Sequence, residues 1–80
     1  MTTHYAAICN QVFFYRKKFG CWIKFVQLAH NFTRTFELTH QEAESRIEDA
    51  MQNDYLRDVG GVICLTSKGY EIIGEKPVLE

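Results

Sequence analysis

The sequence has no long apolar run, and this absence excludes a helix that crosses a membrane. No stretch approaches the roughly 18 apolar residues that spanning a bilayer requires. The N-terminus also lacks a basic segment followed by an apolar one, so no signal peptide is expected. Proline is nearly absent as well, because Pro77 is the only one in the chain. We therefore expect a cytoplasmic protein that makes no membrane contact.

Cysteine is scarce, and its pattern excludes two kinds of site. The cysteines are Cys9, Cys21 and Cys64, an odd number with no Cys-x-x-Cys pair. Neither a disulfide framework nor a zinc site is expected, and buried thiols in a reducing cytoplasm are the simplest interpretation. Cys21 and His30 could act as a nucleophile and a base, but no third group is placed to orient them. We expect no enzyme, no metal and no cofactor.

Acidic residues are missing from the first part of the chain, although the net charge is only −1. Residues 1–36 carry five cations and no acid, which gives +5, whereas residues 37–80 carry ten acids against four cations, which gives −6. This division predicts two faces of opposite potential. The 46% hydrophobic content predicts one modest core. We expect one domain over residues 1–76 and a tail over residues 77–80 that could include a cloning remnant.

Apolar periodicity predicts two helices in the basic part of the chain. The first is expected from Thr3 to Phe19, with Gly20 placed to end it, and the second from Trp22 to Phe32. Phe14 falls on the polar side of the first helix, unlike the other aromatic residues around it. The apolar faces consist of Tyr5, Ile8, Cys9, Val12, Tyr15 and Phe19 in the first helix and of Trp22, Phe25, Val26, Leu28, Ala29 and Phe32 in the second.

The third helix has the clearest start signal in the sequence. Thr39-His-Gln-Glu42 is a capping box, in which the Thr39 hydroxyl and the Glu42 carboxylate each accept from the other residue's backbone N–H. An apolar stripe follows until the helix ends near Asn53. Two short β-favouring segments, 55–59 and 62–66, then flank Gly60-Gly61 and predict a hairpin. Thr66 can cap a last helix that runs from Ser67 to about Ile73. These elements predict an α+β, mostly α fold.

Two segments, Ala43–Leu56 and Leu65-Thr66-Ser67-Lys68-Gly69-Tyr70, resemble the winged helix-turn-helix family. The resemblance that they carry extends over roughly half of the chain. The resemblance implies about three helices, a short two-stranded wing and a short closing helix, with the third helix in a DNA major groove. It places Gln41, Ser45, Glu48 and Gln52 at base edges, with Arg46 and Arg57 as the cations of the helix and the wing. Arg16, Lys17, Lys18, Lys24 and Arg34 are expected to contact the DNA backbone; otherwise they form a solvated helix end.

The acids of the third helix leave a second function open. Carboxylates oppose a phosphate-lined groove, so a winged-helix module that binds a protein is the alternative, for example a phage-encoded inhibitor or adaptor. Its partner would meet the acidic residues Glu44, Glu48 and Asp49, which otherwise form a solvated face, or an exposed Phe14. Phe14 could instead contact the tail at Pro77. The first hypothesis is a small DNA-binding regulator of transcription or of a mobile element, dimeric through the first helix.

Overall fold

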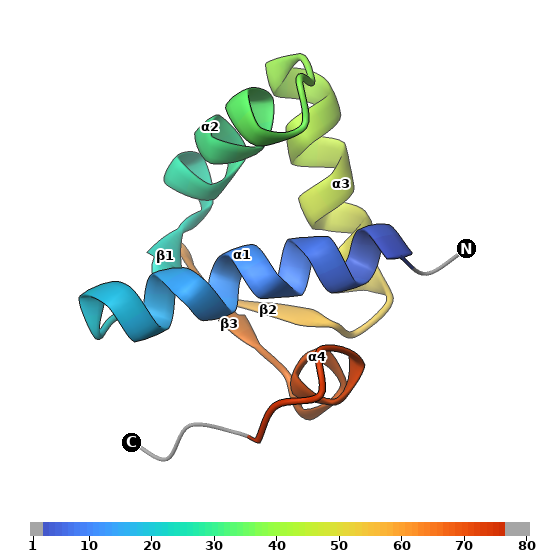
Figure 1. Ribbon diagram of the computed structural model, residues 1–80. Helices are drawn as coiled ribbons and strands as arrows, with labels where there is room; N and C mark the ends of the chain where they lie inside the picture. The colour runs from blue at the N-terminus through green and yellow to red at the C-terminus, as the bar shows by residue number, and fades with distance from the viewer. Residues whose placement is uncertain (1–2, 77–80) are drawn as a thin grey trace.

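The described part of the chain, residues 3–76 of a computed structural model, forms four helices around a small antiparallel sheet (Figure 1). The elements in chain order are α1 (Thr3–Phe19), β1 (Ile23–Lys24), α2 (Phe25–Thr35), α3 (His40–Gln52), β2 (Leu56–Val59), β3 (Val62–Leu65) and α4 (Ser67–Ile72). This order confirms the predicted α+β, mostly α class, with a hairpin and a short closing helix after α3. Within residues 3–76, no helix has the length and apolar character that crossing a membrane needs.

The sheet has three strands: β2 and β3 form the predicted two-stranded hairpin, and β1 is a third strand that the sequence did not predict. Ile23 pairs with Ile63 and Lys24 pairs with Val62, so the strand order is β1-β3-β2. The second helix consequently begins at Phe25 rather than at Trp22, and it continues beyond Phe32 to Thr35. A two-residue strand has no periodicity of its own to detect. It forms because its partner β3 is supplied from a distant part of the sequence.

The predicted local signals are confirmed where they depend on neighbouring residues. Gly20 ends α1 with a φ of +74°, and its N–H donates to the Arg16 carbonyl at 2.9 Å. At the hairpin tip, Gly60 and Gly61 have φ values of +62° and +90°. The Asp58 carboxylate accepts from the Gly61 N–H at 2.9 Å and holds this turn. Positive φ at both central residues is the geometry that favours Gly-Gly in two-residue hairpins.

The core lies between α1 and the inner face of the sheet, with α2, α3 and α4 around it. α1 crosses in front of the strands in Figure 1, and it contacts both β1 and β3. The largest fully buried side chains are Phe32, Ile8, Ile23, Leu28, Ile47, Ile63 and Val12. Phe19 and Val26, assigned to apolar faces from periodicity, are instead exposed, at 57% and 66%. Phe19 occupies the last turn of α1 and packs on the Tyr15 ring, 4.6 Å away, instead of entering the core.

Several residues of the Leu-Thr-Ser-Lys-Gly-Tyr segment pack into one crowded junction, where α3 ends and α4 begins. Thr66 caps α4 by accepting from the Gly69 N–H at 3.1 Å, and its own hydroxyl donates to the Asp54 carbonyl. A Cβ atom at Gly69 would collide with the carbonyl oxygen of Tyr55. Tyr70 is buried and meets the Phe13 ring edge-on, with centroids 6.2 Å apart. The segment therefore joins the end of α3 to α4 and to α1.

Candidate nucleic-acid interface

The outer face of the sheet, turned away from α1, carries two exposed cations. Ile23 and Ile63 are fully buried beneath α1, so the next residue on each strand points to the opposite side. Lys24, Val62 and Val59 form one cross-strand row on that side, and Arg57 lies in the following row, opposite Cys64. Lys24 and Arg57 are both exposed. Sequence periodicity placed Lys24 on a helix, whereas the structure places it in the sheet beside the hairpin.

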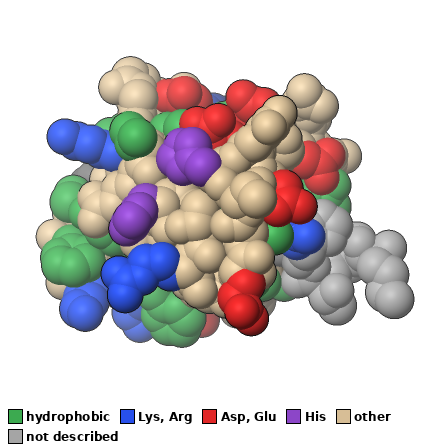
Figure 2. Space-filling view, turned by 90° about the horizontal axis from the view of Figure 1, so that it is seen from above, with side chains coloured by type: hydrophobic (Ala, Val, Ile, Leu, Met, Phe, Trp, Pro, Cys, Tyr) green, Lys and Arg blue, Asp and Glu red, His purple; other side chains and the backbone are tan. Residues whose placement is uncertain are grey.

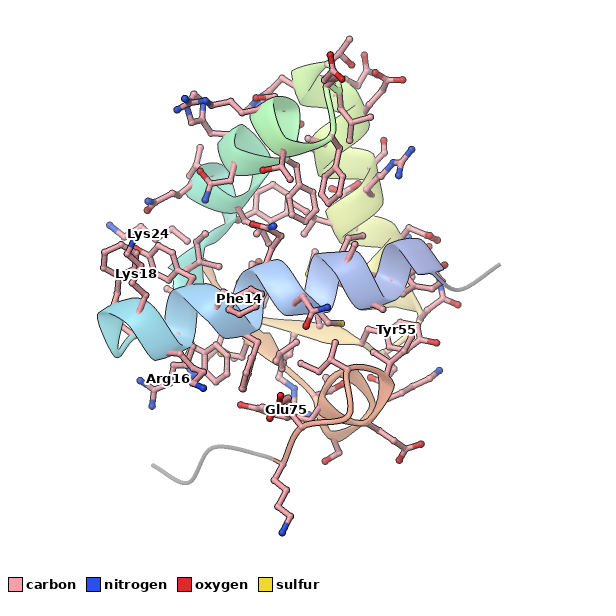
Figure 3. All side chains as sticks on the ribbon, viewed as in Figure 1. Phe14, Arg16, Lys18, Lys24, Tyr55 and Glu75 are labelled. Carbon is pink, nitrogen blue, oxygen red and sulfur yellow. The ribbon has the colours of Figure 1, made fainter. Side chains whose placement is uncertain are left out.

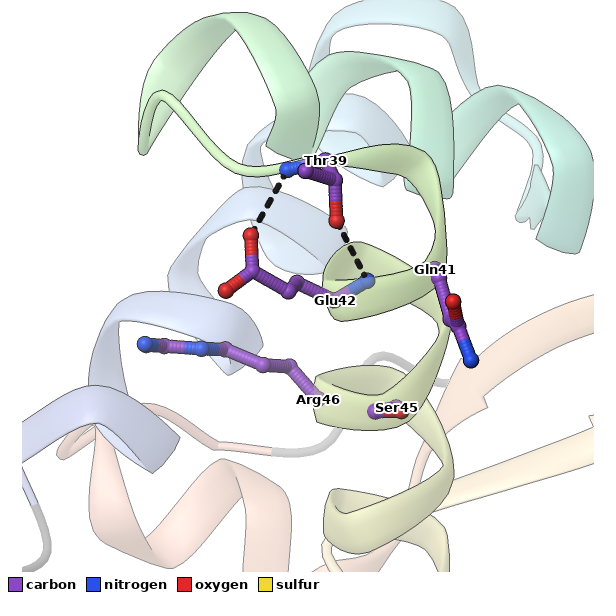
Figure 4. A pocket seen from close by; sticks show the side chains of 5 residues that line it. All are labelled: Thr39, Gln41, Glu42, Ser45 and Arg46. Atoms are coloured by element: carbon purple, nitrogen blue, oxygen red, sulfur yellow. Dashed lines mark hydrogen bonds between the residues drawn. The ribbon is translucent and has the colours of Figure 1, made fainter.

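A polar ridge on α3 lies on the same side of the helix as the hairpin. Gln41, Ser45, Glu48 and Gln52 recur at intervals of four, three and four residues, and all four are exposed. In Figure 4, Gln41 and Ser45 project toward the strands, whereas Glu42 and Arg46 project toward α1. We call the ridge together with Lys24 and Arg57 the sheet–α3 face. This definition includes the base-edge residues expected from the sequence, the expected backbone cation Lys24 and the expected wing cation Arg57.

Arg46 is not part of this ridge, although the sequence placed it among the DNA-binding residues. Its guanidinium lies on the same side of α3 as the Glu42 carboxylate (Figure 4). Thr39, Gln41, Glu42, Ser45 and Arg46 together line an open hollow of about 360 Å³ at the start of α3. The two sides of this hollow therefore differ, with amide and hydroxyl groups toward the hairpin and a charged pair toward α1.

Two carboxylates of α3 are engaged within the helix itself. The Glu42 carboxylate accepts from the Thr39 N–H at 2.9 Å, and the Glu42 N–H donates to the Thr39 hydroxyl at 3.2 Å, which confirms the capping box (Figure 4). This backbone hydrogen bond lowers the pKa of Glu42. Glu44 lies 3.3 Å from His40 one turn earlier. The acidity of the first turns of α3 is therefore partly used to start the helix.

Asp49, one of the acids expected to meet a partner, forms hydrogen bonds within the fold. The Tyr5 hydroxyl donates to its carboxylate at 2.6 Å, and the Asn53 side-chain amide donates to the other carboxylate oxygen at 3.2 Å. The Tyr5 ring also stacks on Tyr55, with centroids 4.7 Å apart. The hydrogen bond to Asp49 raises the pKa of Tyr5. This cluster ties the start of α1 to the end of α3, and it leaves Glu48 as the acid of the exposed ridge.

Arg16, one of the cations expected to contact the DNA backbone, also forms contacts within the fold. Its guanidinium donates to the Gly20 carbonyl and lies 5.4 Å from the centre of the Trp22 ring. Figure 3 shows Arg16 near the end of α1, on a different side of the helix from Phe14. A cation at this position complements the negative end of the helix dipole. Arg16 therefore stabilises the turn that leads from α1 into β1.

The remaining expected cations lie on helices rather than on the sheet. Lys17 and Lys18 are exposed on α1, and Arg34 is exposed near the end of α2. In the view of Figure 2, most Lys and Arg side chains lie toward the left and most Asp and Glu side chains toward the top and right. On this face of the molecule, cationic and acidic side chains therefore gather mostly in different regions. The five cations of residues 1–36 are divided between the sheet, the end of α1 and α2.

The cysteines and histidines form no metal-binding cluster within the described residues. Cys9 is fully buried, and burial raises the pKa of its thiol to about 12. Cys21 is exposed, contrary to the expectation of buried thiols, because it lies in the turn between α1 and β1. His30 is exposed as well. Among residues 3–76, no group of three or more His, Cys, Asp or Glu side chains is placed to hold a metal ion.

Comparisons of the chain with models of protein families, with curated proteins and with solved structures found no match.

Proposed function

We propose that the chain is a DNA-binding module of the winged-helix type, in which α3 enters the major groove and the sheet lies along the backbone. Two observations support this most: α3 carries an exposed polar ridge, with Gln41 and Ser45 directed toward the strands, and the outer face of the sheet carries two exposed cations. A helix in the major groove presents such a ridge to base edges, while flanking positive groups contact phosphates. We further propose a cytoplasmic regulator as its biological class.

The ridge side chains have the chemistry that base edges require. A Gln side chain pairs with adenine through two hydrogen bonds, a Ser hydroxyl accepts or donates at any base, and a carboxylate accepts from the cytosine amino group. Gln41 and Ser45 lie in the first half of α3, the part that contacts bases when a recognition helix enters the groove. The other three acids of α3 have partners within the protein. Glu48 is therefore the acid of α3 that we assign to base readout.

Lys24 and Arg57 are the cations that this geometry assigns to the DNA backbone. Lys24 is also the residue that precedes α2, and the start of α2 has no side-chain cap. The positive end of the α2 dipole is therefore next to an exposed ammonium, which favours a phosphate there. Two cation–phosphate contacts predict a shallow salt dependence, with a slope of log affinity on log salt of about −2.

Binding to DNA is tested by selecting sites from a random duplex library and then measuring affinity by fluorescence anisotropy. We expect Gln41→Ala to lower affinity for a selected site by about tenfold and to relax the preference at one base position. Lys76→Ala, which removes a cation outside the sheet–α3 face, is the control and leaves affinity unchanged. Failure to enrich any site, together with no binding to mixed duplex at low salt, would contradict the proposal.

A further inference from the structure

The outward face of α1, opposite the sheet, carries an aromatic side chain in the middle of a polar surface. Phe14 is 63% exposed and projects from the side of α1 seen in front in Figure 3. Lys17 and Lys18 follow it at i+3 and i+4, so they flank the ring on the next turn. The apolar core of the domain does not need this ring, because the opposite side of α1 supplies the buried residues.

The cations around Phe14 have no acidic partner in the described part of the chain. Within residues 3–76, Lys17, Lys18 and Arg34 form no ion pair. The Lys17 ammonium lies 5.5 Å from the centre of the Phe13 ring, and the Lys18 ammonium lies 5.5 Å from that of Phe19. Since residues 1–36 contain no Asp or Glu, nothing local neutralises this surface. It therefore favours an occupant that brings its own carboxylates.

A polar hollow adjoins this surface, one helical turn away from Phe14. Gln11 of α1 and Asn31, Arg34 and Thr35 of α2 line about 380 Å³ of open space. Gln11 precedes Phe14 by three residues, so the two side chains are neighbours on α1. Amide, hydroxyl and guanidinium donors in one place match a carboxylate, and a guanidinium can bind it through two hydrogen bonds.

We propose that this surface, the α1–α2 face formed by Gln11, Phe14, Lys17, Lys18 and Arg34, binds an acidic segment of another protein. An apolar side chain of the partner packs on Phe14, one of its carboxylates enters the hollow, and others meet the two lysines. The aromatic anchor provides affinity, while the exposed cations provide specificity and speed of association. Phe14 projects from the side of α1 that faces away from the sheet, so we expect the partner to leave α3 free to bind DNA.

Two other occupants fit the surface less well. A two-fold dimer through α1 would bring two copies of an acid-free, cationic face together, and like charges at an interface are unfavourable. Duplex DNA would neutralise Lys17 and Lys18, but it would leave the exposed ring of Phe14 against a phosphate backbone. An acidic partner with an apolar side chain satisfies the ring and the cations together.

The test is a selection of binders from a display library of random linear peptides, with the full chain immobilised. We expect enriched peptides to be rich in Asp and Glu around one or two large apolar residues. Phe14→Ser should weaken an enriched peptide by about tenfold or more. Val26→Ser is the matched control, because Val26 is 66% exposed on another helix face, and it should leave affinity unchanged. Lys17→Glu with Lys18→Glu should abolish binding, whereas Lys76→Glu should preserve it.

Several results would overturn the proposal. Enrichment of uncharged apolar peptides, equal binding to Phe14→Ser, or no enrichment at all would each exclude a specific acidic partner. Sedimentation that shows a dimer lost on Phe14→Ser would assign the face to a second copy of the chain. A loss of duplex DNA affinity in the Lys17→Glu, Lys18→Glu variant would assign it to DNA. DNA binding by the Gln41 ridge is measured in a separate assay. Failure of the acidic-partner proposal is therefore distinguishable from failure of the DNA-binding proposal.

Discussion

The helices α3 and α1 carry opposite charges. The more important difference is that most carboxylates of α3 have partners within the protein, whereas two lysines of α1 have no acidic partner among the described residues. Of the four carboxylates of α3, Glu42 caps the helix, Glu44 lies beside a histidine and Asp49 bonds to Tyr5. On α1, Lys17 and Lys18 have no acid within the described residues to neutralise them. The summed charge of a segment is therefore a poor guide to the charge that its surface presents to a partner. Internal hydrogen bonds occupy some carboxylates of α3, whereas the lysines of α1 stay available.

The largest effect on stability is expected from a substitution that disrupts the junction holding α3 beside the sheet. Gly69→Ala places a Cβ against the Tyr55 carbonyl, which is backbone and cannot turn aside. We expect a loss of about 1–3 kcal/mol in the free energy of unfolding, as for other overpacked sites. Urea denaturation measures it, with the exposed Ser67→Ala in the same helix as the control. Equal midpoints for the two variants would show that the junction is not closely packed.

Two neighbouring acids of α3 test whether engaged and exposed carboxylates differ. Asp49→Ala removes the acceptor of the Tyr5 and Asn53 hydrogen bonds, so we expect a clear fall in the melting temperature. Glu48→Ala removes an exposed acid with no hydrogen bond or ion pair among the described residues, so it should melt as the wild type does. Circular dichroism during heating measures both. Similar melting temperatures would mean that the Asp49 cluster contributes no stability.

The pH dependence of stability tests the role of Glu42 in the capping box. Its pKa in the folded state lies below the ordinary value of 4.5, so its ionised form favours folding. This contribution is complete above the unfolded pKa and is lost as the pH falls through the folded one. Glu42→Gln keeps a capping-box residue but does not titrate. We expect its denaturation midpoint to fall less than that of the wild type between about pH 6 and about pH 3. Identical falls would contradict this assignment.

The smallest expected effect concerns the stability of the α1–α2 face. Phe14→Ser removes a ring that is 63% exposed, and Val26→Ser removes an apolar side chain that is 66% exposed. Each should change the free energy of unfolding by no more than about 0.5 kcal/mol, as most surface substitutions do. Denaturant titration of both variants measures it. A loss several times larger in Phe14→Ser alone would mean that Phe14 supports the fold and is not kept for a partner.

Sequence patterns anticipated the features that depend on neighbouring residues. The capping box at Thr39 and the Gly60-Gly61 turn each require groups only a few positions apart, so their residue types alone predict them. The exposure of Phe14 also followed from helical periodicity, because a regular helix fixes which side a residue occupies.

The features that sequence patterns missed depend on residues far apart in the chain. β1 forms because Ile23 pairs with Ile63. This pairing places Lys24 in the sheet, whereas periodicity predicts it in a helix. The commitment of Asp49 depends on Tyr5, 44 residues away, so local charge counting assigned it to the surface. Of the candidate site, the sequence therefore predicted the ridge of α3 but not which charges remain available around it.

If the two faces bind different partners, two matched double variants should differ in their affinity for duplex DNA. Lys24→Ala with Arg57→Ala removes two cations from the sheet–α3 face, and Lys17→Ala with Lys18→Ala removes two from the α1–α2 face. Duplex DNA affinity is measured for both across a salt series. We expect the first variant to lose about tenfold or more in affinity and most of its salt slope, while the second matches the wild type. The opposite ranking would contradict the account.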